Sequence, residues 1–567
     1  MFHLPYMSKE ILSLPPLMFE AMNENKHNRL LFILWIIVAF LAGFSIALRV
    51  NPNRLSRKSN AQLQKLSEVM GYIDRFYVDS VNVDSIYGLA INAMLQGLDP
   101  HSTYSTAEDN KAMMETLEGS FEGIGIQFNI MNDTLMVVSV ISGGPSEKAG
   151  LMAGDRMVEV DGKSIIGIKN EQAFKLLRGK KGSKVKVGIL RPGFKDKYTY
   201  EITRGVIPTY TVDVAYMMDA HTGYIKLNEF GSTTAREFNN AIRKLKSQGM
   251  TSLMVDLRSN TGGFLDAAVS VCDEFLPNNQ KIVSIEGSKV RPESIYATRQ
   301  GDFEEGRVVI LIDDFSASAS EIVAGAVQDN DRGIIVGRRS FGKGLVQRQF
   351  DLSDNSSIRL TTSRYHTPSG RCIQREYHNG TEAYYEDLYK RLLNGEMESA
   401  DSIHLDSSKV YHTLKGRKVY GGGGIMPDYF VPIDRGDNMN AYYDIANSSA
   451  LIQFAFHYAT EHKADLQRRF ADAKSYVAGM TVTDEMLHQL IAYYEKTSKK
   501  KVSNMTPTAS KELKVWLKAL IGRNLYGDEA FYPVINQTDK VILKAKELIA
   551  NSQQLTANSQ QPTANSQ

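Results

Sequence analysis

The sequence predicts a multidomain α/β protein, and three patterns along its 567 residues lead to this prediction. Strand-like and helix-like segments alternate over 223–347, which is typical of a sheet with helices on its faces. Short alternating segments with frequent glycine fill 119–204 and indicate a small β-rich module. Helical spacing of apolar residues dominates 61–98 and 445–550, so helical regions are expected on either side.

Composition excludes several classes of protein. Lys+Arg is 66 and Asp+Glu is 64, so the formal net charge is only +2, and no nucleic-acid partner is expected. The two cysteines, Cys272 and Cys372, exclude a disulfide-dense scaffold and a CxxC motif. The sequence contains no HExxH motif and no cluster of His and Asp, so neither a metal nor another cofactor is expected.

An apolar segment near the N-terminus predicts a transmembrane helix. The 19 residues of 30–48 carry no charge and span about 28 Å as a helix, which is enough to cross a hydrocarbon core. A cleaved signal peptide remains the alternative, although Ser45-Ile46-Ala47 is a weak cleavage site. Basic residues stand on both sides of the span, so the charge rule does not settle its orientation. Either Met1 or Met22 is the start of translation.

The α/β region can be followed element by element. Strands are expected at 223–227, 252–257 and 307–312. Thr234-x-x-Glu237 is a capping-box pattern, which predicts the start of a helix that Gly249 ends. A second helix is expected over 265–275, after the turn RSNTGG.

The chain path after the third strand brings two reactive residue types together. A helix from Ser318 to Asp331 leads about 20 Å away, and an extended run over 333–340 returns about 23 Å. Because the outward and return paths match, Lys343 is expected beside Ser318. Gly342 and Gly344 flank the lysine and allow a tight turn.

A serine at a helix N-terminus beside a lysine is a candidate nucleophile and base. A neutral amine can accept the hydroxyl proton, so burial must lower the pKa of Lys343. The N–H groups that follow Ser318, and those of the Gly262-Gly263 turn, are placed to hold an oxyanion. The alternatives are helix capping by Ser318-x-x-Glu321 and an exposed lysine in a glycine turn.

These residues lie in segments that resemble the carboxy-terminal processing proteases, the tail-specific serine peptidases of family S41. The resemblance extends over most of 60–435 and rests on these segments, in the same order: LDPHSTY, DLRSNTGG, SASASEI, QDNDRG, VGRRSFGKGLVQ, TPSGR and YGGGGIMPD. It implies a protease core of the α/β crotonase/ClpP-like type.

The resemblance also implies the roles of individual residues. It implies three catalytic residues: the nucleophile Ser318, the general base Lys343, and Gln347, which orients the lysine. It implies an oxyanion hole built from the Ala319 amide and the amide of Gly262 or Gly263. Arg339 and Ser340 depart from the lysine-threonine that is common in the family.

Residues 119–204 resemble a PDZ domain. The sequence GIGI, at Gly123, Ile124, Gly125 and Ile126, corresponds to the loop whose N–H groups receive a terminal carboxylate. The strand that follows offers an edge for an extended peptide. The resemblance therefore implies protein substrates that bind through their C-termini.

The leading hypothesis is a serine endopeptidase with a Ser-Lys dyad that cleaves C-terminal regions of envelope proteins through an acyl-enzyme. The resemblance implies a single-pass protein of the inner (cytoplasmic) membrane, with its catalytic part on the periplasmic side. It also implies a homo-oligomer and an adaptor protein as partners. Two alternatives stay open: a catalytically silent PDZ scaffold, and a Ser-His hydrolase that depends on His366.

The predicted segments, in order, are a cytoplasmic leader (1–29), the anchor (30–48), a helical region (60–115), the PDZ domain (116–205), the peptidase core (206–435), a second helical region (436–550) and a disordered tail (551–567).

Overall fold

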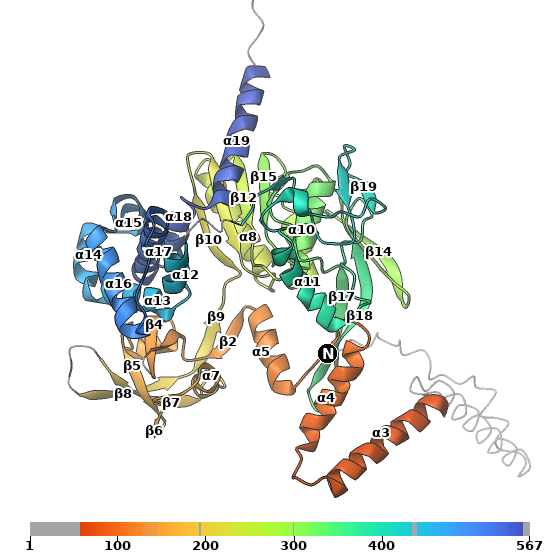
Figure 1. The fold of residues 1–567 in the computed structure, drawn as a ribbon, viewed down its shortest axis with the longest axis horizontal. Coiled ribbons are helices and arrows are strands. Elements are labelled where there is room, and N and C mark those ends of the chain that lie inside the picture. The colour runs from red at the N-terminus through yellow and green to blue at the C-terminus, as the bar shows by residue number, and fades with distance from the viewer. Residues whose placement is uncertain are drawn as a thin grey trace, which may run out of the picture. The chain divides into compact units, whose positions relative to one another are not determined.

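The computed structural model describes residues 57–559, except for 132, 142, 192, 193, 195, 299 and 434–438. The chain divides into two compact units, Met1–Leu89 and Ala90–Gln567. The described part of the first unit consists of α3 (Arg57–Phe76) and the beginning of α4 (Val83–Gln96), as Figure 1 shows.

The described residues contain no helix that is both long and apolar enough to cross a membrane. The predicted anchor at 30–48 and the leader at 1–29 lie outside the described residues, so both stay predictions.

The β-rich module consists of a six-stranded sheet and two short helices. The sheet has the order β3 (Ile126–Met131), β4 (Thr134–Val140), β5 (Arg156–Val160), β7 (Lys184–Leu190) and β8 (Lys197–Thr203), and β6 (Lys163–Ser164) pairs with β5. Its core is formed by inward-facing residues such as Val137, Val187 and Ile189. The helices are α6 (Pro145–Ala149) and α7 (Asn170–Leu177), and β2 (Ser120–Gly123) pairs with β9 (Gly205–Pro208) at the module's boundary.

The α/β core contains a second six-stranded sheet. Its order is β10 (Val212–Met217), β11 (Thr222–Leu227), β12 (Ser252–Asp256), β15 (Arg307–Ile312), β16 (Ile334–Gly337) and β21 (Tyr429–Phe430). Only the pair β10–β11 is antiparallel. The parallel strands end at the same edge, and this places the loops after β12, β15 and β16 close together.

Both faces of this sheet are covered, which explains why its strands are almost continuously apolar. One face packs against α8 (Thr234–Ser247), α9 (Leu265–Cys272) and α10 (Ala319–Asp329), with Ile225, Val255 and Ile310 in the shared core. Alternate residues of the same strands, such as Met254 and Val309, face the other side. There they contact α19 (Lys540–Ser559) through Val541, Ile542, Ala545 and Ile549.

The capping box predicted at the start of α8 is wrong. The N-cap is Thr233, and the Thr234 hydroxyl accepts a hydrogen bond from the Gly231 N–H instead of capping the helix. The carboxylate of Glu237 accepts hydrogen bonds from the N–H groups of Thr211 and Val212, at the start of β10. Glu237 therefore binds backbone N–H groups near the start of β10 instead of the N-terminus of its own helix. Those N–H groups also need an acceptor.

A third sheet holds the loops of the core in place. It has the order β1 (Thr103–Ser105), β18 (Ser357–His366), β13 (Lys281–Gly287) and β14 (Val290–Tyr296), with β17 (Leu345–Asp351) also paired to β18. Beside it lie α5 (Ala107–Leu117) and α11 (Thr381–Leu393), and β19 (Val410–His412) pairs with β20 (Lys418–Tyr420).

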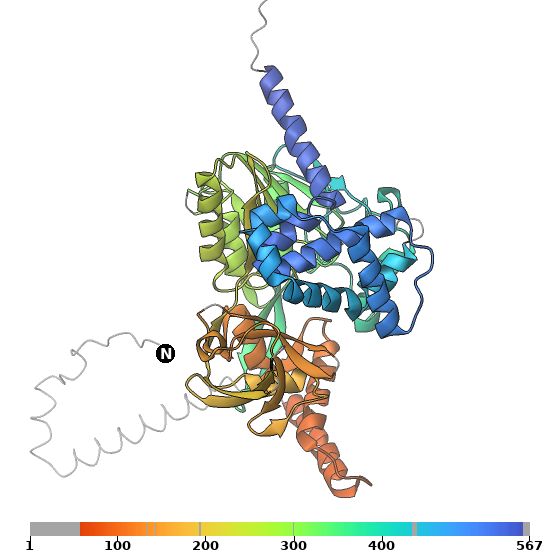
Figure 2. The same cartoon turned by 90° about the vertical axis from the view of Figure 1, so that its left-hand side faces the viewer.

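The C-terminal region is helical, as predicted, and its helices are the blue ones in Figure 2. Their buried apolar side chains form a core of their own. Its helices are α12 (Asn440–Ala446), α13 (Ser449–Glu461), α14 (Lys463–Arg469), α15 (Ala473–Gly479), α16 (Asp484–Ser498), α17 (Pro507–Tyr526) and α18 (Asp528–Ile535). Helix α19 continues to Ser559, so 551–559 differ from the predicted disorder. The first half of α19 is anchored on the sheet, and a helix extends easily from an anchored turn.

The buried ion pair between Asp329 and Arg371 is expected to stabilise the core. Both side chains are fully buried with a separation of 2.7 Å, and the Ser369 hydroxyl also donates to Asp329. Asp329→Ala would leave the guanidinium buried and unpaired, so we expect a loss of about 3–5 kcal/mol in the free energy of unfolding, measured with denaturant. Glu386→Ala removes an exposed ion pair with Lys390 and should stay within about 0.5 kcal/mol of the wild type. Similar effects of the two changes would contradict this prediction.

Candidate active site

Ser318 lies in a strained turn between β15 and α10. Its φ angle is 55°, a region that non-glycine residues rarely adopt, and the side chain is half-buried. Asn260 supports this turn, because its carbonyl accepts hydrogen bonds from the Ala317 N–H and the Ser320 hydroxyl. The loops after β12 and β15 are thereby joined at the carboxyl edge of the sheet.

Lys343 lies in the glycine turn before β17, as the matched path lengths predicted. Strand β16 pairs in parallel with β15, from Val309 opposite Ile334 to Ile312 opposite Gly337, and so returns the chain to the edge where Ser318 lies. The Lys343 side chain is half-buried. The Tyr365 hydroxyl lies 2.8 Å from the Lys343 carbonyl and 3.1 Å from the Ser318 carbonyl, so it bridges the two turns.

The fully buried carboxylate of Glu321 joins these turns more strongly. One of its oxygens accepts hydrogen bonds from the Ser318 and Lys343 N–H groups, each at 2.8 Å. The other accepts from the Gly342 N–H at 2.7 Å and from the Ser340 hydroxyl at 2.5 Å. Burial raises the pKa of Glu321, and these four donors act against that effect. Glu321 thus fixes the backbone of both candidate residues.

Ser318, Lys343 and Gln347 line one cavity of about 630 Å³, together with Gly262 and Gly263. The structure shows no hydrogen bond between the Ser318 hydroxyl and the Lys343 amine among the described residues. Such contacts are often loose without substrate and tighten when it binds. The arrangement brings a hydroxyl and an amine to the same cavity wall.

The environment of Lys343 favours a neutral amine. Burial lowers its pKa from 10.5 to about 8, and the positive charge of Arg359 acts in the same direction. The carboxylates of Glu321 and Asp99 act against both effects. A substantial fraction of Lys343 is therefore unprotonated in weakly alkaline solution.

Gln347 is held by a chain of hydrogen bonds. Its amide nitrogen donates to the Thr361 hydroxyl at 3.3 Å, and that hydroxyl donates to Asp99 at 3.1 Å. Asp99 also accepts from the N–H groups of His101 and Ser102, which fixes the turn in the LDPHSTY segment. The structure therefore brings Gln347 to the cavity, although no described hydrogen bond joins it to Lys343.

The two candidate oxyanion glycines differ. The Gly262 N–H donates to the Asn260 side chain at 2.9 Å, so it already has an acceptor. Among the described residues, the Gly263 and Ala319 N–H groups have none. The Gly262 carbonyl accepts from the Phe230 N–H, so the Gly263 N–H of the same trans peptide points the opposite way. A Cβ on Gly262 would lie 2.8 Å from the Ser318 Cβ, which shows how closely the two loops approach.

Comparison with known proteins agrees with this architecture. Residues 221–383 match peptidase family S41, residues 123–202 match the PDZ domain, and residues 441–527 match a family of unknown function (DUF8443). The carboxy-terminal-processing protease of Bartonella bacilliformis is 39% identical, over 55% of this chain and 73% of the relative. The chain belongs to the carboxy-terminal processing proteases of family S41. It is thus a serine-type C-terminal processing peptidase.

Other relatives of this protease have similar names. Carboxy-terminal processing protease CtpA of Bacillus subtilis is 33% identical over 61% of this chain and 75% of the relative. Among solved structures, a photosystem II D1 C-terminal processing protease is 30% identical, with a TM-score of 0.31, over 54% of this chain and 88% of that chain. The PDZ domain of a carboxy-terminal protease from Vibrio cholerae is 32% identical, with a TM-score of 0.15, over 16% of this chain and 97% of that domain.

The GIGI loop of the protease leads into an edge strand of the PDZ sheet. Strand β3 has β4 as its only neighbour in the described sheet, so its other edge is open to a peptide. The Ile124 and Gly125 N–H groups have no acceptor among the described residues. The carbonyls of the same two residues accept from Ser146 and Ile141, which holds the loop in shape.

The histidine considered as a rival base lies elsewhere. His366 ends β18 opposite Ser284 and does not line the cavity. The histidine near Lys343 is His101, which lies 2.9 Å from the Tyr384 hydroxyl. Burial lowers the pKa of His101 to about 3, and Lys343 adds to this effect, so the imidazole is neutral near pH 7.

Sequence reasoning missed several residues of the protease site. It noticed Glu321 only as a capping residue, although a carboxylate at the start of an apolar helix was a usable signal. It did not identify four half-buried residues that wall the cavity: Met113, Met114, Leu117 and Phe264. It also missed Arg359, which lines the same cavity.

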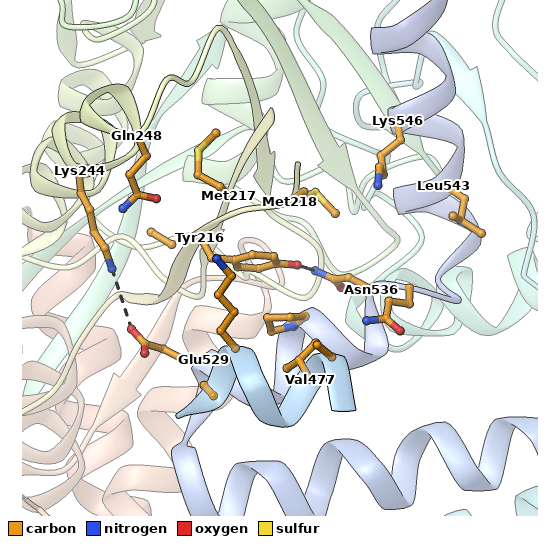
Figure 3. A pocket seen from close by; sticks show the side chains of 16 residues that line it. Tyr216, Met217, Met218, Lys244, Gln248, Val477, Glu529, Asn536, Leu543 and Lys546 are labelled. Carbon is orange, nitrogen blue, oxygen red and sulfur yellow. Dashed lines mark hydrogen bonds and ion pairs between the residues drawn. The ribbon is translucent and has the colours of Figure 1, made fainter. Parts of the chain in front are cut away.

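A second cavity, of about 690 Å³, lies between the protease core and the C-terminal helices. Figure 3 shows the Tyr216 hydroxyl pointing toward Asn536, with which it forms a hydrogen bond of 2.9 Å. Lys244 approaches Glu529 at 3.9 Å across the same space. No serine, cysteine or histidine lines this cavity, so it offers no nucleophile like that of the first cavity.

We expect Glu321→Gln to reduce cleavage strongly. Both oxygens of the Glu321 carboxylate accept hydrogen bonds. In the glutamine variant an NH₂ group replaces one of these oxygens and faces N–H donors that it cannot accept from, so we expect the two turns to move apart. A shift near 1 Å costs about 100-fold in rate, and the broken hydrogen bonds cost about 1–3 kcal/mol in stability. Steady-state kinetics and denaturant unfolding measure the two effects. The exposed Glu286→Gln should change neither, and wild-type rates in Glu321→Gln would contradict the structural argument.

Proposed function

We propose that this protease is an endopeptidase in which Ser318 and Lys343 form the catalytic dyad. The observation that carries the proposal is the shared cavity, in which the serine lies at a strained helix start and burial lowers the pKa of the lysine to about 8. Gln347 lines the same cavity and is held there by its hydrogen bond to the Thr361 hydroxyl. In the proposal, Gln347 orients the Lys343 amine.

In the proposed reaction, the neutral Lys343 amine takes the proton of the Ser318 hydroxyl as its oxygen attacks the substrate carbonyl. The Ala319 and Gly263 N–H groups stabilise the oxyanion. Lys343 then returns the proton to the leaving amine as the C–N bond breaks, which leaves an ester at Ser318. Lys343 next takes a proton from a water molecule, whose oxygen attacks the ester carbonyl. The bond between that carbon and the Ser318 oxygen then breaks, Lys343 gives the proton to the serine oxygen, and the acid product leaves.

We further propose that the PDZ domain selects substrates by their C-termini. The Ile124 and Gly125 N–H groups, which have no acceptor in the described part of the chain, and the open edge of β3 support this role. Helix α5 connects this domain to the cavity: Met113 and Met114 line the cavity, and Glu115 of the same helix forms an ion pair with Arg178 at 3.2 Å.

The cellular setting rests on the sequence alone. The apolar segment at 30–48 supports a single-pass anchor in the cytoplasmic membrane, with the peptidase on the periplasmic side. C-terminal regions of envelope proteins are then the accessible substrates. A homo-oligomer and an adaptor protein are the proposed partners.

Three variants test the dyad on an unfolded protein substrate. Ser318→Ala and Lys343→Ala should each lower the cleavage rate by about 1000-fold or more, because each removes one member of a unit. His366→Ala should cleave at the wild-type rate. Mass spectrometry of acid-quenched wild type should show an acyl group on Ser318. Loss of cleavage in His366→Ala together with wild-type rates in Lys343→Ala would refute the dyad in favour of a histidine base, and binding without cleavage in the wild type would establish the silent scaffold.

The pH dependence follows from Lys343. The amine acts only when unprotonated, so kcat/KM should rise as the pH increases through about 8 and then level off. Initial rates across buffers of constant ionic strength measure this profile. A rate limb near pH 6.5, the ordinary histidine range, would instead indicate a histidine base.

Removal of the terminal charge tests the PDZ proposal. A peptide substrate with a C-terminal amide should show a KM about tenfold higher than the free acid, because charge-assisted hydrogen bonds are lost. Gly125→Ala should abolish this difference, because a Cβ there would lie 2.9 Å from Ile207. Gly162→Ala shares the positive φ but meets open space, so it should keep the difference. Equal KM values for acid and amide in the wild type would refute the proposal.

A further inference from the structure

One positively charged side chain of the active-site cavity, that of Arg359, has no role in the proposed reaction. Arg359, on β18, lines the cavity with Ser318 and Lys343, and the residue is half-buried. Among the described residues, its guanidinium forms neither an ion pair nor a hydrogen bond to another side chain. Burial lowers the pKa of Arg359, and no carboxylate acts against this effect.

Other arginines around the site are paired. Arg338 binds Asp314, Arg339 binds Glu396 and Arg375 binds Asp387, with separations of 2.9, 2.5 and 2.8 Å. A guanidinium that is partly withdrawn from water without an acceptor costs free energy. An anion that enters the cavity would recover this free energy, which is the usual basis of a carboxylate-binding arginine.

Strand pairing places Arg359 two residues along the β17–β18 hairpin from Gln347. Gln347 lies opposite Thr361, and Gln349 lies opposite Arg359, in the antiparallel pair β17–β18. Gln347, Gln349 and Arg359 all line the cavity, so this face of the hairpin forms one wall. Two residues along a strand cover about 7 Å, so Arg359 is within reach of a substrate residue two or three positions from the scissile bond.

The charges that surround this position favour an acidic group. Lys343 and Arg359 are on the same wall, and Glu229 is the only carboxylate among the residues that line the cavity. Glu229 follows β11, and the loop after β12 contributes the adjacent Thr261 and Phe264. The remaining wall is formed by Met113, Met114, Thr116 and Leu117 of α5, and it carries no charged group.

We propose that Arg359 binds a carboxylate of the protein substrate next to the scissile bond. This inference rests on the proposed function of the same cavity. The carboxylate comes either from an Asp or Glu side chain or from the substrate's own C-terminus when only a few residues follow the cleaved bond. Arg359 is thus a specificity residue, whereas Ser318 and Lys343 carry the chemistry.

A charge exchange tests the subsite. Matched peptides that share one C-terminus carry Glu, Gln or Lys at single positions within three residues of the cleaved bond. The wild type should prefer Glu to Gln about tenfold in kcat/KM at one position, mainly through KM. Arg359→Gln should lose this preference, and Arg359→Glu should prefer Lys at the same position. Assays at about pH 9.5 keep Lys343 largely neutral in all variants.

Arg348→Glu is the matched control, because this exposed residue is the neighbour of Gln349 on β17 and does not line the cavity. It should keep the wild-type preference. If Arg359→Glu loses activity on all peptides equally, or if the wild type shows no preference at any position, the subsite proposal is wrong. Ser318-dependent cleavage without any charge preference refutes only the subsite, whereas cleavage that survives Ser318→Ala refutes the proposed function.

A second set of peptides identifies the source of the carboxylate. These peptides end two or three residues after the cleaved bond, carry no acidic side chain there, and have either a free acid or an amide at the terminus. Arg359→Gln should abolish a preference for the acid if the terminus is the ligand. A preference confined to internal Glu in the first set assigns the subsite to side chains. Absence of both preferences overturns the proposal.

Discussion

The site depends on one buried carboxylate that joins two loops. Glu321 accepts hydrogen bonds from the Ser318 and Lys343 N–H groups with the same oxygen, and it holds Gly342 and Ser340 with the other. Each backbone position is thereby fixed relative to the other, although 25 positions of sequence separate them. Separation of the two loops would remove donors from a buried carboxylate, and this costs free energy of folding. Glu321 therefore stabilises the arrangement in which the loops stay together.

Part of this site could be predicted from the sequence because regular elements have known lengths. One helix and one parallel strand lead from Ser318 to Lys343, and their rises per residue are constants. The structure bears out the return path through β16, although α10 ends at Asp329, two residues before the predicted Asp331. Side-chain alternation along β17 could not be taken from the sequence, because a bulge between Val346 and Gln347 shifts the register. Lys343 and Gln347 still line one cavity, whereas Leu345 is buried.

The rest of the site could not be predicted because it depends on contacts between distant segments. Thr361 and Asp99 hold Gln347 only because β1 and β17 both pair with β18. The capping pattern at Ser318-x-x-Glu321 accounts for one of the four donors to Glu321, and the same pattern at Thr234-x-x-Glu237 is used otherwise. A local motif indicates which donors are near in sequence, whereas tertiary structure decides which donors finally bind.

Substrate binding affects Lys343 in two opposite ways. A peptide that fills the cavity excludes water from the amine, and this lowers its pKa further. A substrate carboxylate on Arg359 would offset the positive charge that now also lowers this pKa, and so would raise it. Burial is already the largest cause of the shift, ahead of the charge of Arg359. Exclusion of water should therefore prevail, and the base stays neutral in the complex, where it must accept the proton of Ser318.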